Sequence, residues 1–298
     1  MAISDDWGVS MTRATRGPWI VAIATLSLYI SPLAAQDAQP SQANRAALCV
    51  DVDTGRVLYE RNADTRLFPA SLTKMMTLYE LFSALDRNET QFTDSLTVSE
   101  HASAQLPSKL GLKAGDTISV DAAIRAITVL SANDVAVTIA ENIGGTEDAF
   151  SARMTEDAKA MGMVNTQFVN ASGLPNADQH SSARDLYVLA RRLLMAFPEY
   201  YHYFSLETLT WKGHRFSTHN HLLGKVEGVD GIKTGYIRAS GFHLVASAER
   251  GEHRLIAVVM GEPTARQRDE AVARLLDAEF TRLGDEATKS TLARFDLP

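Results

Sequence analysis

The chain has 298 residues, of which 45% are hydrophobic and 22% are charged, and its formal net charge is −7. These proportions are typical of a soluble globular protein, and the length suffices for one large domain or two small ones. Because the chain is acidic and shows no basic stripe, we do not expect it to bind nucleic acid.

The first segment predicts export. Two arginines precede an uncharged apolar run over 19–30, and small residues follow that run. A positive flank, a short apolar core and a small-residue end are the features of a secretory signal peptide. We therefore predict a signal peptide over 1–35, a periplasmic or secreted location, and a flexible polar leader over 36–44. An uncleaved N-terminal anchor is the alternative.

The fold is expected to begin near Arg45 with two strands, over 46–52 and 56–59, joined by turn residues. Cys49 lies within the first strand and is the one cysteine of the chain, so no internal disulfide can form. We interpret it as a buried strand residue. A nucleophilic or lipid-modified thiol is the alternative.

Helical periodicity dominates the middle of the chain. Apolar residues at helical spacing predict a helix over 71–85, a mostly helical stretch over 120–163 and another helix over 183–196.

After Gly231 the pattern becomes β, with strands over 241–248 and 255–260, and an amphipathic helix follows over 268–283. The order of strands, helices, strands and helix favours an α/β (α+β) fold. In it, an antiparallel sheet with strands from both ends of the chain is flanked by helices and interrupted by an all-helical insertion. We place this domain at 45–285 and a C-terminal tail at 286–298.

Ser71 and Lys74 form a Ser-x-x-Lys motif at the start of the first predicted helix. Residues three apart share a helix face, so Lys74 can reach the Ser71 hydroxyl. A lysine whose pKa is lowered by burial or by a second cation can remove a serine proton. Alone the motif is weak, and a helix cap followed by a solvated lysine is the alternative.

Two further polar motifs follow. Ser131 and Asn133 could relay a proton and hold a substrate carbonyl, or could simply break two apolar helices. Lys233, Thr234 and Gly235 stand at the start of a predicted strand. They would supply a cation, a hydroxyl for a carboxylate and room for a substrate backbone, unless they form a surface turn.

The three motifs, in this order, are the signature set of penicillin-binding proteins and serine β-lactamases. The residues around them resemble the D-alanyl-D-alanine carboxypeptidase family of low-molecular-mass penicillin-binding proteins, over about 45–283. The stretches that carry this resemblance are Pro69 to Lys74, Ser131 to Asp134, Phe168 to Pro175, His180 to Asp185 and Gly231 to Tyr236.

This resemblance implies a β-lactamase/transpeptidase-like fold and a serine peptidase that removes the terminal D-alanine from peptidoglycan stem peptides. It also implies acylation by β-lactam antibiotics and no cofactor or metal. Family members often carry a second β-rich domain and a C-terminal amphipathic anchor, and we find neither in this sequence. We therefore expect no strong membrane anchor after signal cleavage.

By the same resemblance, Ser71 attacks the substrate, Lys74 is its general base and Ser131 shuttles the proton. The backbone N–H groups of Ser71 and Tyr236 would form the oxyanion hole. The residues expected to bind substrate are Asn133, Lys233, Thr234, Gly235, Tyr236 and Arg268.

Arg268 stands where the family has an arginine, just after the penultimate strand of the domain. Arg266 remains open for that role, and a surface charge at a helix start is the alternative for Arg268. Ile237 departs from the family pattern, because many members have a small hydroxyl residue there. Together with Arg238 it leaves the pocket wall undefined.

Other functions remain open. A D,D-endopeptidase would use the same residues, and a β-lactamase would have to place a deacylating water, although no Glu-x-x-x-Asn follows the second motif. A zinc peptidase is disfavoured because His219 and His221 lack a third ligand, and we interpret both as surface or strand-edge residues. A penicillin-binding sensor without turnover is the non-enzymatic alternative.

Overall fold

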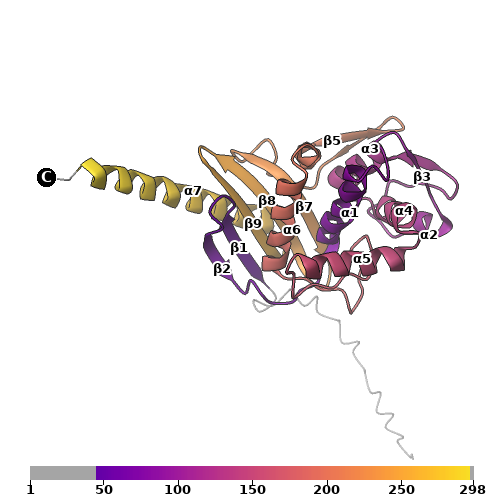
Figure 1. Ribbon diagram of the computed structural model, residues 1–298, viewed down its shortest axis with the longest axis horizontal. Coiled ribbons are helices and arrows are strands. Elements are labelled where there is room, and N and C mark those ends of the chain that lie inside the picture. Colours follow the sequence, from indigo (N-terminus) through magenta and orange to yellow (C-terminus); the bar gives the residue numbers. More distant parts are fainter. Residues whose placement is uncertain (1–44, 296–298) are drawn as a thin grey trace, which may run out of the picture. The chain divides into compact units, whose positions relative to one another are not determined.

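Strands from both ends of the described chain form one antiparallel sheet. The structure is a computed structural model that describes residues 45–295, with side chains to 286. Its five strands lie in the order β2-β1-β9-β8-β7 (Figure 1). Their bounds are β1 (Ala46–Asp51), β2 (Val57–Arg61), β7 (Val229–Ile237), β8 (Gly241–Arg250) and β9 (His253–Glu262). The predicted sheet, with its helical insertion, is confirmed.

Alternate residues of the central strands face two separate cores, as the period of two in a strand requires. Leu48 and Val50 of β1 belong to the core that includes α6 (Ala183–Ala196), which lies over one face of the sheet (Figure 1). Cys49 belongs to the core that α7 (Ala265–Phe295) covers on the other face. Cys49 is fully buried, so its interpretation as a buried strand residue is confirmed.

The chain between β2 and β7 is mainly helical, as predicted. Its helices are α1 (Lys74–Asp86), α2 (Glu100–Ser103), α3 (Val120–Arg125), α4 (Asn133–Gly144), α5 (Glu147–Ala160) and α6. Two hairpins that we did not predict lie in the same region. They pair β3 (Ser95–Thr97) with β4 (Thr117–Ser119) and β5 (Thr208–Trp211) with β6 (His214–Ser217).

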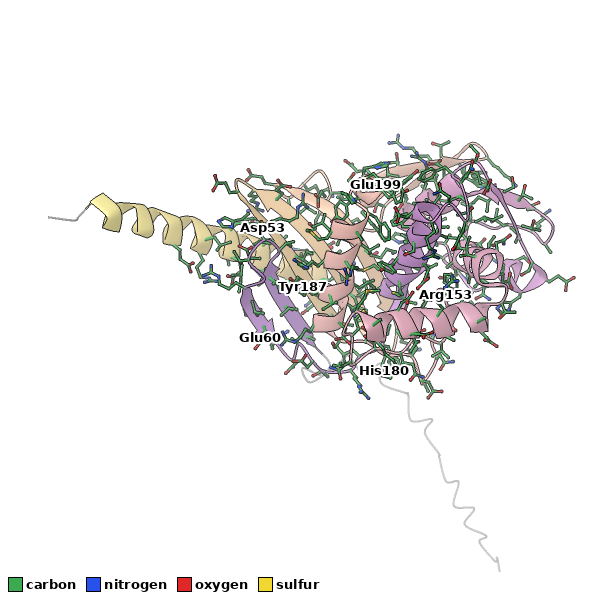
Figure 2. The ribbon with its side chains drawn as sticks, viewed as in Figure 1. Asp53, Glu60, Arg153, His180, Tyr187 and Glu199 are labelled. Atoms are coloured by element: carbon green, nitrogen blue, oxygen red, sulfur yellow. The ribbon has the colours of Figure 1, made fainter. Side chains whose placement is uncertain are left out.

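The start of α6 is tied to its surroundings by charged side chains. Arg184 donates from Nη2 to Oε2 of Glu60 at 2.7 Å and from Nε to Oδ1 of Asp64 at 2.7 Å. Glu60 lies on β2, at the edge of the sheet (Figure 2). Asp185 accepts from the Asn165 N–H at 2.7 Å. Arg184 and Asp185 therefore fix the start of α6 against β2 and the preceding loop.

The structure bears on the predicted C-terminal end of the domain but not on the segments predicted before residue 45. The predicted signal peptide over 1–35 and leader over 36–44 lie outside the described residues. Helix α7 continues to Phe295, past the helix end expected near 283, and the domain boundary at 285 stays a prediction. Within the described part of the chain, no helix is both long and apolar enough to span a bilayer.

Candidate active site

The Ser71 hydroxyl and the Lys74 amine meet at the start of α1. A short 3₁₀-helix over Ala70–Thr73 leads directly into α1. Side chains three residues apart are aligned in a 3₁₀ turn, and Lys74 Nζ lies 3.1 Å from Ser71 Oγ. The spacing of the Ser-x-x-Lys motif thus gives the contact expected of it.

Three groups hold the amine of Lys74, which is fully buried. Besides Ser71 Oγ, Lys74 Nζ donates to Oδ1 of Asn133 at 2.7 Å and to the carbonyl oxygen of Ser172. Burial, and then the charge of Lys233, hold the pKa of Lys74 well below that of an ordinary lysine, against the opposing effect of Asp134. A neutral amine that faces a serine hydroxyl is able to accept its proton.

Ser131 connects the second motif to the third. It ends a π-helical turn over Ala126–Leu130 and has a left-handed backbone with φ of 61°. Such turns and such backbone conformations are frequent at functional sites. Lys233 Nζ donates to Ser131 Oγ at 3.0 Å, and burial followed by the charge of Arg268 lowers the pKa of Lys233 to about 7. The second amine therefore reaches the cleft through the Ser131 hydroxyl.

Asn133 and Asp134 position the loop at the mouth of the cleft. Asn133 Nδ2 donates to the carbonyl oxygen of Leu106 at 2.7 Å. The Asp134 carboxylate accepts from the backbone N–H groups of Leu110 at 2.9 Å and Gly111 at 2.8 Å. The sequence does not indicate this role of Asp134, because its partners are backbone groups of a loop more than 20 residues away.

The loop after α5 closes against the start of α1. Thr77 Oγ1 of α1 donates to the carbonyl oxygen of Ala171 at 2.6 Å, and Gly173, two residues further along the loop, has φ of 82°. A Cβ on Gly173 would lie 1.9 Å from the carbonyl oxygen of Ala70. Only glycine fits between this loop and the turn that carries Ser71.

We expect Gly173→Ala to destabilise the fold and to lower β-lactam labelling, because it combines a positive φ with a backbone clash. The backbone conformation alone costs about 1–3 kcal/mol. Gly162→Ala is the matched control, since Gly162 has φ of 87° and open space around it. Melting temperature and labelling are measured for both. An equal loss in the two variants would contradict the close packing described here.

Arg268 lines the cleft from the start of α7. It is 2% exposed and donates to the carbonyl oxygens of His243 at 3.2 Å and His219 at 3.3 Å. We expected Arg268 to follow the penultimate strand of the domain. This is wrong, because Arg268 follows β9, the last strand of the sheet in chain order. The surface-charge alternative is also wrong. Arg266 is exposed and pairs with Glu270 at 2.7 Å.

These groups surround one cleft of about 450 Å³. Its lining residues come from the 3₁₀ turn before α1, the loop between α2 and β4, the turns before α4 and β7, the loop before α6, strands β7 and β8, and the start of α7. They are Ser71, Pro107, Ser108, Ser131, Asn133, Gly173, Leu174, His219, His221, Thr234, Gly235, Tyr236, Ile237, Phe242, Ala265 and Arg268. Lys74 and Lys233 are buried and contact the cleft through the two serines. All the site residues named from the sequence therefore converge on it.

Strand β7 forms one wall of the cleft. The sequence predicted Lys233, Thr234 and Gly235 at the start of a strand, but they run from the middle of β7 onward. A Cβ on Gly235 would lie 3.0 Å from the carbonyl oxygen of Pro69, so β7 runs close to the turn that carries Ser71. Tyr236 is 52% exposed and stacks on Phe242 with ring centroids 4.2 Å apart. Ile237 completes an apolar wall there.

His219 and His221 are exposed, yet both line the cleft, which the sequence did not indicate. Desolvation, followed by the charge of Lys233, lowers the pKa of His219 to about 4, so its ring is neutral. His221 Nδ1 lies 3.0 Å from Oδ2 of Asp269. Within residues 45–295, no group of three or more histidine, cysteine or acidic side chains is arranged to hold a metal ion.

Comparison with known proteins gives concordant matches. A family model described as D-alanyl-D-alanine carboxypeptidase, Peptidase_S11, matches residues 34–264. The carboxypeptidase DacF of Bacillus subtilis is 35% identical over 272 residues, which is 88% of this chain and 70% of the relative.

Solved structures show the same similarity. Penicillin-binding protein 5 from Haemophilus influenzae superimposes with a TM-score of 0.77 at 36% identity, covering 79% of this chain and 70% of the other. Penicillin-binding protein D2 from Listeria monocytogenes, in a cefotaxime-bound form, gives 0.71 at 34% identity, covering 79% and 96%. Sequence and fold thus agree over most of the described chain.

Proposed function

The chain belongs to the D-alanyl-D-alanine carboxypeptidase family, and from this premise we propose that Ser71 is the nucleophile of a serine-type D-Ala-D-Ala carboxypeptidase. One observation carries the assignment. Ser71 lines the cleft, and its hydroxyl lies 3.1 Å from the amine of the fully buried Lys74. The substrate is a peptidoglycan stem peptide that ends in D-Ala-D-Ala.

In the first half of the reaction, Ser71 Oγ attacks the carbonyl carbon of the penultimate D-alanine. The neutral amine of Lys74 accepts the hydroxyl proton. The developing oxyanion is bound by the backbone N–H groups of Ser71 and Tyr236, on the two elements that pack together at Gly235. Each such donor contributes about 3 kcal/mol to the stability of the transition state.

In the second half of the acylation, the amide bond breaks and the terminal D-alanine leaves. Its nitrogen needs a proton, and the Ser131 hydroxyl passes one on, supported by Lys233 at 3.0 Å. The proton that Lys74 took from Ser71 replaces the one that Ser131 has given to the leaving nitrogen. Water then attacks the ester at Ser71, and the same groups return the enzyme to its starting state.

The residues that orient the substrate are Asn133, Thr234, Gly235 and Arg268. Asn133 holds a carbonyl of the peptide, and the β7 backbone at Gly235 pairs with it along the strand. The free carboxylate of the terminal residue is bound by the Thr234 hydroxyl and by Arg268, whose buried guanidinium suits a carboxylate.

We expect Arg268→Gln to raise KM for a peptide ending in D-Ala-D-Ala by about 30-fold or more, since a lost buried charge contact costs about 2–5 kcal/mol. A peptide with a C-terminal amide should be hydrolysed slowly and equally by both enzymes. Arg266→Gln is the matched control. Equal losses on the carboxylate and amide peptides would indicate a purely structural role for Arg268.

β-Lactams react at the same serine in this proposal. The relative from Listeria monocytogenes has been solved with cefotaxime and with ampicillin bound, and this chain shares its fold over 79% of its length. A β-lactam carbonyl in the cleft would be attacked by Ser71 Oγ, its ring nitrogen would leave, and the ester would persist because the leaving group stays attached.

The family acts on the cell wall, outside the cytoplasm. We further propose a periplasmic or secreted location, reached through cleavage of a signal peptide over 1–35. D-alanine release from a stem peptide, with and without EDTA, tests the serine reaction against the zinc alternative. The lifetime of the penicillin ester distinguishes a peptidase from a β-lactamase, which would release it within milliseconds.

A further inference from the structure

The turn that carries Ser71 has a strained backbone and depends on its neighbours. Ala70, the residue before Ser71, has a left-handed conformation with φ of 49°. A residue other than glycine keeps this conformation only where the surrounding structure holds it. The loop at Gly173 packs against the turn. A second contact holds the residues just before it, because the carbonyl oxygen of Phe68 accepts a hydrogen bond from Nε2 of His243 at 3.1 Å.

His243 lies at a β-bulge between β8 and β9. The register of the pair shifts around His243, where β9 has one extra residue. Gly261 lies in this bulge with φ of 88°, and its N–H donates to Nδ1 of His243 at 2.9 Å. The chain continues from the bulge into α7, which carries Arg268. The imidazole therefore lies between the turn that carries Ser71 and the segment that leads to Arg268.

The two backbone partners fix the state of the imidazole. A backbone N–H can only donate and a carbonyl oxygen can only accept, so Nδ1 carries no hydrogen and Nε2 carries one. Nε2 also lies 2.9 Å from Oγ of Ser240, in the turn between β7 and β8. The ring is fully buried, and burial lowers the pKa of His243 to about 4, against the opposing effect of the hydrogen bond to Phe68. The ring is therefore neutral at neutral pH and holds both backbone groups at once.

The backbone of His243 contacts the other end of the proposed substrate. Its carbonyl oxygen accepts from Nη1 of Arg268 at 3.2 Å, and the guanidinium is proposed to bind the substrate carboxylate. His243 is not among the residues that line the cleft, so it acts through the groups that it holds. We propose that His243 is a positioning residue that sets the Ser71 turn relative to Arg268. This inference rests on the proposed function, and it adds no step to the reaction.

Two variants separate the two contacts of the ring. The asparagine amide and Nδ1 of histidine are both bonded to Cγ, so His243→Asn can keep the bond from Gly261 but cannot reach Phe68. The longer glutamine amide reaches the place of Nε2, so His243→Gln can keep the bond to Phe68 and loses the one from Gly261. Each variant leaves one buried backbone group unpaired, and the melting temperature should fall in both.

Acylation of Ser71 by a labelled β-lactam, followed over a range of concentrations, is the measurement. His243→Asn should lower the maximal rate by at least about tenfold, since a misplacement of about 1 Å costs up to about 10²-fold. The concentration that gives half of this rate should stay within about threefold, because the backbone contact with Arg268 remains. His243→Gln should keep the maximal rate within about threefold. His202→Asn, at an exposed histidine outside the cleft lining, is the control and should acylate normally.

Three results would overturn the inference. They are a wild-type maximal rate in His243→Asn, an equal fall in His243→Gln, and a change confined to the half-saturating concentration. None of them affects the proposed function, which depends on acylation of the wild-type enzyme at Ser71. Nitrogen NMR of the wild-type imidazole decides the matter where a variant does not fold. Hydrogen on Nε2 alone supports the inference, and hydrogen on Nδ1 contradicts it.

Discussion

Replacing Ser71 with alanine is expected to lower D-alanine release by about a millionfold, the loss typical of removing a peptidase nucleophile. The covalent route disappears because no other hydroxyl stands 3.1 Å from the Lys74 amine among the described contacts. The fold should persist, since Ser71 contributes a side chain to an open cleft rather than to a core. D-alanine release and β-lactam labelling are the two measurements.

Ser83→Ala is the control for this variant. Ser83 lies on α1, the helix that Ser71 precedes, and does not line the cleft. It should keep both D-alanine release and labelling. Residual turnover in Ser71→Ala at more than about one part in a thousand would show that another group carries the reaction.

Replacing Lys74 with methionine should slow acylation of Ser71 by about 10³–10⁴-fold, the upper range of a general base. Methionine keeps the length and apolar stem of the side chain, so packing around α1 should change little. The hydroxyl would lose the amine that takes its proton, and Asn133 Oδ1 would lose its donor. Lys109→Met, outside the cleft lining, is the control and should acylate normally.

The pH dependence of acylation tests the same role. The amine must be neutral to act, so the rate should rise as pH increases through the pKa of Lys74. Burial and the nearby Lys233 hold that pKa well below the ordinary lysine value of 10.5, so the rise in rate should come at a pH well below that value. Lys74→Met should lose this acid limb. If the limb persists in the variant, Lys74 is not the base.

Much of the fold could be predicted from periodicity alone. The helix predicted over 183–196 has those bounds in the structure, and the strands predicted over 46–52, 56–59, 241–248 and 255–260 end within two residues of β1, β2, β8 and β9. The hairpins β3-β4 and β5-β6 were missed because their strands have only three or four residues, too few to show an alternation. Their pairing depends on the helical region against which they pack.

The active-site residues divide in a similar way. Ser71 and Lys74 were predictable because a local spacing of three brings them together. The contact of Ser131 with Lys233 spans 102 positions, and only the resemblance to a family indicated it. Ser172 and Gly173 carry no chemistry in the sequence. Their importance lies in a backbone carbonyl and in the absence of a Cβ, which only the folded chain reveals.

The position of the two histidines at the cleft could not be predicted from the sequence pattern. His219 and His221 were interpreted as surface residues because no third ligand accompanied them, and they are indeed exposed. Their backbone places them at the end of the cleft, where His219 contributes a carbonyl oxygen to Arg268 and His221 contacts Asp269. Nothing in the local sequence indicated that a turn before β7 would meet the first turns of α7.

Peptide mapping of the chain after reaction with a labelled β-lactam tests the central assignment most directly. A single adduct per molecule is expected, on the peptide that contains Ser71, and it should be absent from Ser71→Ala. An adduct on another residue, or full D-alanine release by a chain that cannot be labelled at position 71, would contradict the mechanism.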